Sequence, residues 1–259
     1  MAWPSRCAGE MERDLTQLYP HIWRLIAPNP SPMTGLGTNT YLVGHKQVAI
    51  IDPGPQNEAH LNNTLHALEK LKARAQAVII THAHSDHAGS ASQLAERLAV
   101  PLMSFKDPFN DGDEIEVGGL HLEIQHTPGH IQAHICLLLE EQQLLLAGDL
   151  VAGQGTILII PPDGDMADYL NSLVAMKALA PAAILPGHGP VIDNPQALLQ
   201  EYIDHRLARE QQVLYWWRQE VQTAQDIAAQ IYADRPAALG IATMQVEAHL
   251  EKLRKEGRL

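Results

Sequence analysis

The sequence predicts an α+β fold with a large layered domain, residues 21–204, followed by a small helical module, residues 205–259. In the first part, short apolar runs bounded by turn residues alternate with helical patterns, as expected for stacked layers of strands and helices. From about residue 205 only helical spacing remains. Because the first predicted strand begins at Ile22, residues 1–20 are expected to form an N-terminal extension. A chain of 259 residues with 46% hydrophobic residues can bury a large core.

Strands and helices can be assigned in order from the spacing of the apolar residues. Residues 22–26 form the first predicted strand, and residues 40–43 and 47–51 form a hairpin. Prolines and glycines between residues 28 and 37 predict a loop. Four leucines mark one face of the first predicted helix, namely Leu61, Leu65, Leu68 and Leu71. Further strands are predicted at residues 77–80, 120–124, 135–139, 144–146 and 182–184, and further helices over residues 91–98, around residues 170–174 and from Asn194.

The charge of the chain is unevenly divided. The net charge is −12, but residues 1–204 hold 10 Lys and Arg against 23 Asp and Glu, whereas residues 205–259 hold 8 against 7. A strongly acidic domain disfavours a polyanionic partner, because nucleic-acid affinity depends on neutralising phosphates. This charge still allows a short nucleic-acid strand to be held by bound metals.

The cysteines and the apolar runs bound the compartment. Two cysteines, Cys7 and Cys136, cannot build a disulfide framework and fit a reducing compartment. The first residues lack the apolar segment of a secretory signal, and no run approaches the roughly 18 apolar residues of a membrane span. We therefore expect a cytoplasmic protein with no membrane partner.

Four metal-ligating side chains lie within one short stretch, residues 81–89. His82, His84, Asp86 and His87 follow the predicted strand at residues 77–80 and precede a predicted helix. Loops at strand ends are where layered folds usually place their sites. A pair of divalent metals needs about seven or eight ligand positions, so further ligands are expected elsewhere.

Three more candidate ligands follow other predicted strands. His130 ends Thr127-Pro128-Gly129-His130, Asp149 follows Gly148, and His188 lies between Gly187 and Gly189. Each has a neighbouring Gly or Pro, which lets the backbone turn tightly. A lone His or Asp at a strand end is more often structural. Here four separate segments, each following a predicted strand, carry candidate ligands in this order, which favours one shared site.

This series of motifs resembles the metallo-β-lactamase fold superfamily of binuclear metallohydrolases. The motifs are HxHxDH at residues 82–87, TPGH at 127–130, GD at 148–149 and PGHGP at 186–190, and the resemblance covers residues 21–190. Residues 27–30, residues 37–44 and the helical tail are similar to the lactamase-β-like 2 group, which includes an animal mitochondrial single-strand endoribonuclease and fungal polyketide thioesterases. The resemblance implies a four-layer αβ/βα sandwich.

The resemblance also implies roles for the candidate residues. Two zinc ions are expected, although manganese and iron accept similar ligands. The first metal would be held by His82, His84 and His130, the second by Asp86, His87 and His188, with Asp149 bridging them. The residues expected to take part in catalysis are Asp86, His87 and Asp149. A water between the two metals would lose a proton near neutral pH and attack the substrate.

Residues beside the motifs are expected to support the site. Asp52 is expected to orient the histidine loop, and His134 matches a supporting position of the superfamily. His126 is expected to be structural. The segment Gly153–Thr156 is expected to form a wall of the substrate pocket, and residues 161–165 are expected to border its entrance.

The C-terminal part is similar to a small winged-helix module. Leu207, Leu214, Trp217 and Val221 have heptad-like spacing on one long helix, and a cap at Thr223 begins another. A last helix carries Val246, Leu250 and Leu253 on one face, and the cations Arg254, Lys255 and Arg258 lie near its end. These cations could contact nucleic acid, but the near-neutral module favours a role in packing, with a homodimer as one outcome.

Three functions are consistent with these patterns. The favoured one is a metal-dependent hydrolase acting on a small-molecule thioester, ester or lactone. The first alternative is a single-strand-specific endoribonuclease, which a basic or aromatic groove beside the metals would favour. The second is a non-enzymatic winged-helix regulator, which the complete ligand set disfavours.

Overall fold

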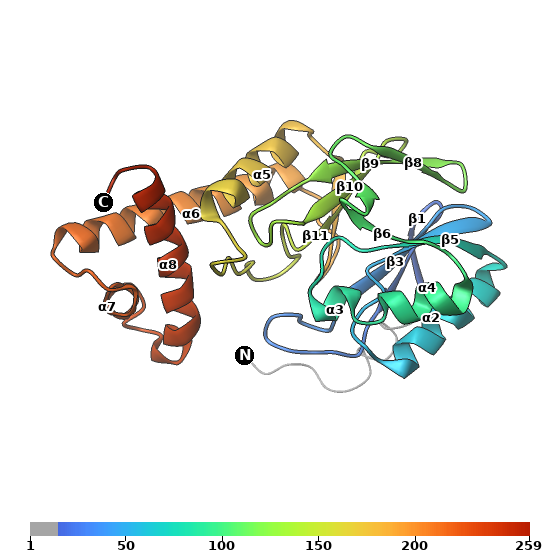
Figure 1. Cartoon of the computed structure of the whole chain (residues 1–259), viewed down its shortest axis with the longest axis horizontal. Helices are drawn as coiled ribbons and strands as arrows, with labels where there is room; N and C mark the ends of the chain where they lie inside the picture. Colours follow the sequence, from blue (N-terminus) through green and yellow to red (C-terminus); the bar gives the residue numbers. More distant parts are fainter. Residues whose placement is uncertain (1–14) are drawn as a thin grey trace.

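The computed structural model of the protein describes residues 15–259. Two stacked sheets form its centre (Figure 1). One sheet has seven strands in the order β1 (Thr16–Tyr19), β2 (Ile22–Ile26), β3 (Asn39–Val43), β4 (Gln47–Ile51), β5 (Arg74–Ile79), β6 (Leu102–Phe105) and β7 (Pro108–Phe109). The other has five strands in the order β12 (Ala183–Pro186), β11 (Leu144–Gly148), β10 (Ile135–Leu139), β9 (Leu120–His126) and β8 (Glu114–Val117).

Helices cover the outer face of each sheet. The helices α2 (Glu58–Leu71) and α4 (Ala91–Leu98) pack on the seven-stranded sheet. Between them in the chain, the short helix α3 (Ser85–Ala88) forms the end of the histidine-rich stretch, residues 81–89. The helices α5 (Met166–Ala178) and α6 (Pro195–Arg218) lie on the five-stranded sheet. Figure 1 shows the resulting order of helix, sheet, sheet and helix. The predicted four-layer α+β sandwich is therefore confirmed.

The central strands are buried on both faces, and their side chains alternate between two cores. On β10, Cys136 and Leu138 face the helices α5 and α6, whereas Leu137 and Leu139 face the other sheet. A strand alternates its side chains with a period of two, so a continuous apolar run supplies both faces. This explains why these strands are uninterrupted runs of apolar residues in the sequence.

The C-terminal helices form a separate apolar cluster at one end of the sandwich (Figure 1). The far half of α6 packs with α7 (Ala224–Ile231), the 3₁₀ turn η1 (Pro236–Ala238) and α8 (Leu239–Lys255). Thr223 caps α7 by accepting a hydrogen bond from Asp226 N, as predicted. The predicted face of α8 is confirmed, since Val246, Leu250 and Leu253 are fully buried. Among residues 15–259, no helix has the length and apolar character needed to cross a bilayer.

The structure also corrects the predicted elements. The heptad-like spacing around α6 is wrong at both ends, because Leu207 is 42% exposed and Val221 follows the last helical residue, Arg218. The strand β1 was not predicted. It lies inside the segment expected to be an extension, residues 1–20, and pairs with β2. The helix α6 runs without a break through residue 204. The proposed division into an extension and two domains stays a prediction, and residues 1–14 of the extension, with Cys7, lie outside the described residues.

Candidate metal centre

The seven candidate ligands lie on four loops that follow β5, β9, β11 and β12. Each loop leaves the end of a buried strand, so the two sheets hold the loops in fixed positions. The side chains gather into two groups, one of His82, His84, His130 and Asp149 and the other of Asp86, His87 and His188. Within each group the ligand atoms lie within 4.8 Å of one another.

In the first group three imidazole nitrogens converge. His84 Nδ1 lies 3.0 Å from His82 Nε2 and 2.9 Å from His130 Nε2. The side chains of His82 and His130 are almost fully buried, so their nitrogens have little access to water. Such a set of close, inward-pointing nitrogens suits a transition-metal ion.

The second group combines two histidines with a carboxylate. His87 Nε2 and His188 Nε2 are 3.2 Å apart, and Asp86 Oδ2 lies 3.3 Å from His188 Nε2. His87 is fully buried, whereas the Asp86 side chain is 31% exposed. The group therefore has one open side, at Asp86.

Asp149 lies between the two groups and faces both. Its Oδ2 is 3.5 Å from His130 Nε2, and its Oδ1 is 3.4 Å from Nε2 of both His87 and His188. Oδ1 is buried and has no hydrogen-bond partner among the described residues. A buried carboxylate oxygen without a partner is costly, and a bound cation would supply one. The donor set therefore fits a pair of metal ions that share Asp149.

Three of the candidate ligands have pKa shifts that agree with metal binding. Burial, and then the nearby His87, hold the pKa of His82 well below its usual value, and burial lowers the pKa of His130. Burial acts to raise the pKa of Asp149, but His87 outweighs burial and keeps that pKa well below normal. The two imidazoles are thus neutral and the carboxylate ionised at neutral pH, as ligands must be.

Asp52 fixes two of the ligands from outside the groups. Its Oδ2 accepts hydrogen bonds from His87 Nδ1 at 2.8 Å and from the Thr81 hydroxyl at 2.7 Å. Its Oδ1 accepts a hydrogen bond from Thr81 N at 2.7 Å, and Thr81 Oγ1 in turn lies 3.0 Å from His82 Nδ1. Burial acts to lower the pKa of His87, but Asp149 and Asp52 outweigh burial and raise that pKa well above its usual value. A bound metal would therefore displace the proton at Nε2, while Nδ1 keeps donating to Asp52. The expected orienting role of Asp52 agrees with these contacts.

His130 and His134 are held in a similar way. His130 Nδ1 donates to the carbonyl of Leu158 at 2.7 Å, which leaves Nε2 free for a ligand. His134 Nε2 accepts a hydrogen bond from Asp149 N at 3.0 Å, and burial lowers the pKa of His134 to about 3. The neutral His134 therefore anchors the backbone that carries Asp149. By contrast, His126 stacks on Phe105 with ring centroids 3.9 Å apart and belongs to neither group.

Two glycines allow the loops to approach this closely. A Cβ on Gly187 would lie 2.6 Å from His87 Cε1 and 2.9 Å from Asp149 Oδ1. A Cβ on Gly148, where φ is +46°, would lie 2.6 Å from Thr81 Oγ1. Both positions have to stay free of a side chain for the ligand-bearing loops to meet.

A cavity of about 620 Å³ opens beside His188. It is lined mostly by the loop at residues 31–37 and by strands β2 and β3, together with Gln154, Gly155 and residues 188–190. Gln154 and Gly155, from the segment expected to form a wall of the substrate pocket, line this cavity. The loop at residues 161–165 contributes no described residue to this lining, and its expected place at the entrance of a substrate pocket stays a prediction.

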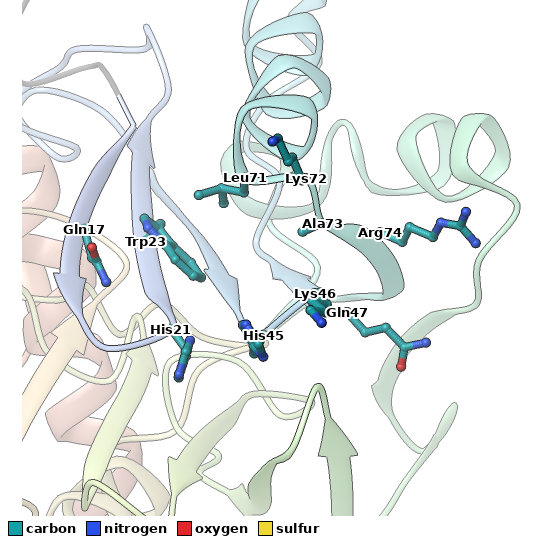
Figure 2. Close-up of a pocket in the computed structure, with 11 residues that line it drawn as sticks. Gln17, His21, Trp23, His45, Lys46, Gln47, Leu71, Lys72, Ala73 and Arg74 are labelled. Carbon is teal, nitrogen blue, oxygen red and sulfur yellow. The ribbon is translucent and has the colours of Figure 1, made fainter.

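A second cavity of about 630 Å³ lies at the other end of the seven-stranded sheet (Figure 2). Its lining includes Gln47 and Arg74, the first residues of β4 and β5, and none of the seven candidate ligands. Figure 2 shows the side chains of Gln47 and Arg74 extending toward one side and that of Lys72 pointing away from them. Similar size therefore does not make this cavity a reaction site.

Sequence reasoning missed three residues with contacts near the site. Thr81 directly precedes the motif at residues 82–87 and had no predicted role, although it joins Asp52 to His82. Asn39 donates to the carbonyls of Pro186 and Gly189 and so ties β3 to the loop that carries His188. Arg24 lines the cavity beside His188. Its signal in the sequence was a charged residue in an otherwise apolar strand, Ile22–Ile26.

The chain matches two known domain families. The sequence profile of the metallo-beta-lactamase superfamily matches residues 33–107 and 103–188. The profile of the beta-lactamase associated winged helix domain matches residues 223–259, which contain α7 and α8. The predicted superfamily and the predicted winged-helix character of the C-terminal module are thereby confirmed.

Similar proteins extend over most of the chain. A Caenorhabditis elegans protein named beta-lactamase-like protein 2 homolog is 33% identical over 91% of this chain and 85% of that relative. An Aspergillus chevalieri protein named atrochrysone carboxyl ACP thioesterase is 30% identical over 86% of this chain and 77% of that relative. The crystal structure of a beta-lactamase domain protein from Burkholderia ambifaria has the same fold, with a TM-score of 0.83 at 20% identity over 95% of this chain and 89% of that one.

Proposed function

The chain belongs to the metallo-β-lactamase superfamily, and we propose that it is a binuclear zinc hydrolase that cleaves a small-molecule thioester, ester or lactone. The observation that carries the proposal is the pair of His and Asp groups that share Asp149 beside an open cavity. Nitrogen-rich ligation with a few carboxylates suits zinc, although manganese and iron accept similar sites.

The chain's own residues would divide the work as follows. His82, His84 and His130 would hold one metal, Asp86, His87 and His188 the other, and Asp149 both. When bound, such metals polarise the substrate carbonyl and make a water nucleophilic near neutral pH. Asp86 would orient the attacking water through its carboxylate, because it is the partly exposed member of its group. Asp52 and His134 would hold the ligands in register.

The cavity favours a small acyl substrate. Apolar side chains such as Ile26, Met33 and Leu36 line it, and its described lining contains no aromatic residue. Pockets of about 300–1,000 Å³ accommodate small organic molecules. The similar Aspergillus chevalieri protein is named as a thioesterase, which supports a thioester as the first substrate to test.

The charges near the site do not favour RNA. Among its described lining residues, the cavity beside His188 has neither the stacked aromatics nor the row of cations with which proteins hold single-stranded nucleic acid. The three C-terminal cations considered for nucleic-acid contact are each engaged by a carboxylate: Arg254 by Glu247 at 2.7 Å, Lys255 by Asp165 at 2.5 Å and Arg258 by Glu210 at 2.5 Å. The endoribonuclease therefore ranks second, and the homodimer stays a prediction.

Metal content and turnover, measured together, test the proposal. The purified protein would be assayed before and after chelation on an acyl thioester and on a short single-stranded RNA. We expect two metals per chain and thioester cleavage that chelation abolishes and zinc restores. His126→Ala, which removes a nearby histidine outside both groups, should keep metal and turnover. Chelator-sensitive RNA cutting at comparable efficiency would instead support the endoribonuclease, and protein without metal or turnover would support the regulator.

A further inference from the structure

Arg24 is the one permanently charged side chain among the described residues that line the cavity beside His188. It extends from β2, on the same face as Ile26 two residues further along. Its Nε is buried and has no hydrogen-bond partner, and no ion pair or hydrogen bond of its guanidinium occurs within residues 15–259. A buried donor without a partner costs free energy, so its retention calls for an explanation.

The surroundings of Arg24 do not provide a structural partner. The residue faces Tyr41 across the β2–β3 ladder, but the Tyr41 hydroxyl donates to the carbonyl of Pro186 at 2.7 Å. Carboxylates are plentiful in this acidic part of the chain, yet none of the described lining residues is an Asp or a Glu. The cation therefore faces a cavity that contains no counter-ion of its own.

A second polar atom in the same cavity lacks a partner. Asn39 Oδ1 is buried without a hydrogen bond, while Asn39 Nδ2 is fully used by the carbonyls of Pro186 and Gly189. These two carbonyls fix which end of the amide is oxygen, because only the NH₂ group can donate to them. The residues that line the cavity thus include an unpaired cation and an amide with a buried, unpaired oxygen.

The position of Arg24 relative to the metal ligands follows from the strand register. Arg24 pairs with Tyr41, and Thr38, three residues earlier on the same strand path, bridges to His188. A strand rises about 3.3 Å per residue, so Arg24 and His188 are roughly 10 Å apart along this wall of the cavity. A ligand that contacts both would span that length.

We propose that Arg24 determines substrate specificity by binding an anionic group, a carboxylate or a phosphate, on a part of the substrate remote from the bond that is cleaved. The planar guanidinium fork matches both groups with paired hydrogen bonds. This inference rests on the proposed hydrolase, since it names the class of acyl substrate that the hydrolase takes.

Two substrate pairs test the proposal in the metal-loaded protein. The first pair is an acyl thioester ending in a carboxylate and its carboxamide analogue, both on a neutral thiol. The second is a neutral acyl thioester on a phosphorylated thiol and the same thioester on the unphosphorylated thiol. For each protein the ratio of kcat/KM, charged over neutral, is measured, so a general loss of activity cancels.

We expect the wild-type protein to prefer the charged member of one pair by about 10- to 100-fold, the effect of a charge-assisted hydrogen bond. In Arg24→Met this ratio should fall close to one, mainly through KM, because the contact is remote from the reacting carbonyl. Arg24→Lys should restore part of it. Arg74→Met is the matched control, since Arg74 lies at the opposite cavity (Figure 2) and should keep the wild-type ratio. The pair that responds tells whether the anion belongs to the acyl group or to the thiol.

Binding of thioether analogues, which cannot be hydrolysed, separates this inference from the proposed function. Calorimetry should show about 10- to 100-fold weaker binding of the charged thioether to Arg24→Met, with the neutral one little changed. If thioesters are not cleaved but this difference is present, the hydrolase proposal fails and the anion site stands. If both ratios and both affinities are the same in wild type and Arg24→Met, the inference is wrong.

Discussion

Replacing Asp52 with asparagine should weaken metal binding at the second group while the fold stays in place. Three donors converge on the Asp52 carboxylate: Thr81 N, the Thr81 hydroxyl and His87 Nδ1. Asparagine has the same shape and tolerates the positive φ of 49° at this position, so the backbone is not strained. Its amide, however, has one acceptor oxygen in place of two.

The geometry decides where the new NH₂ group lies. At the position of Oδ1 it would face Thr81 N–H, which cannot turn away. At the position of Oδ2 it faces His87 Nδ1, and the ring avoids the clash by giving up the Nδ1 proton and keeping one on Nε2. His87 Nε2 lies 3.2 Å from His188 Nε2 and 3.4 Å from Asp149 Oδ1, so that proton occupies the place of the second metal.

The magnitude follows from restoring the metal-binding tautomer. A metal at the second group then leaves two donors facing each other, which costs about 1–3 kcal/mol. We expect the dissociation constant of the second metal to rise about 10- to 100-fold, with a smaller change at the first group, which Asp52 reaches through Thr81.

A metal titration against a chromophoric chelator, fitted to two sites, measures both constants. Far-ultraviolet circular dichroism checks that the variant is folded. Asp163→Asn makes the same chemical change on an exposed loop and should leave both constants unchanged. If a folded Asp52→Asn binds both metals with wild-type affinity, the argument that Asp52 sets the His87 tautomer is wrong.

Three further outcomes are expected. His84→Ala and Asp149→Ala should each lose bound metal and turnover together, and elemental analysis showing full metal content with full turnover would contradict the ligand assignment. Burial lowers the pKa of His249 to about 3, and both of its ring nitrogens lack partners among the described residues. In the unfolded chain the pKa of this histidine is near 6.5, so the unfolded chain takes up the proton more readily than the folded protein. Stability should therefore fall as the pH drops below about 6.5, by about 2 kcal/mol at pH 5, and urea unfolding of His249→Leu should lack this part of the pH dependence; equal slopes in both proteins would exclude it. Lys252 and Glu210 form a buried ion pair in which Lys252 Nζ lies 2.6 Å from Glu210 Oε2. Glu210→Ala removes this partner of Lys252 and should destabilise the C-terminal helices by about 3–5 kcal/mol. An unchanged thermal transition would show that Glu256 alone neutralises Lys252.

The layers of the fold and the identity of the candidate ligands could be predicted from local patterns. Strands such as β10 and β11 are continuous apolar runs because both faces are buried, and this pattern survives in the sequence. The end of α6 could not be placed in this way. Its spacing continued to Val221, but the helix ends at Arg218 because the chain turns there to pack α7 and α8 on it.

By itself, the sequence determined which side chains can bind metal and that they follow strands, since ligand chemistry and strand periodicity are properties of neighbouring residues. Only the tertiary structure decided how these side chains are shared. The two-sided contacts of Asp149, the link from Asp52 to His87 and the isolation of Arg24 all depend on residues far apart in the chain, such as Asn39 and Gly189, which are 150 positions apart. Contacts over such distances form when sheets stack and loops close, so no spacing within a short stretch of sequence encodes them. The same holds for Lys255 and Arg258, whose carboxylate partners Asp165 and Glu210 are brought near by the packing of α8 against α5 and α6.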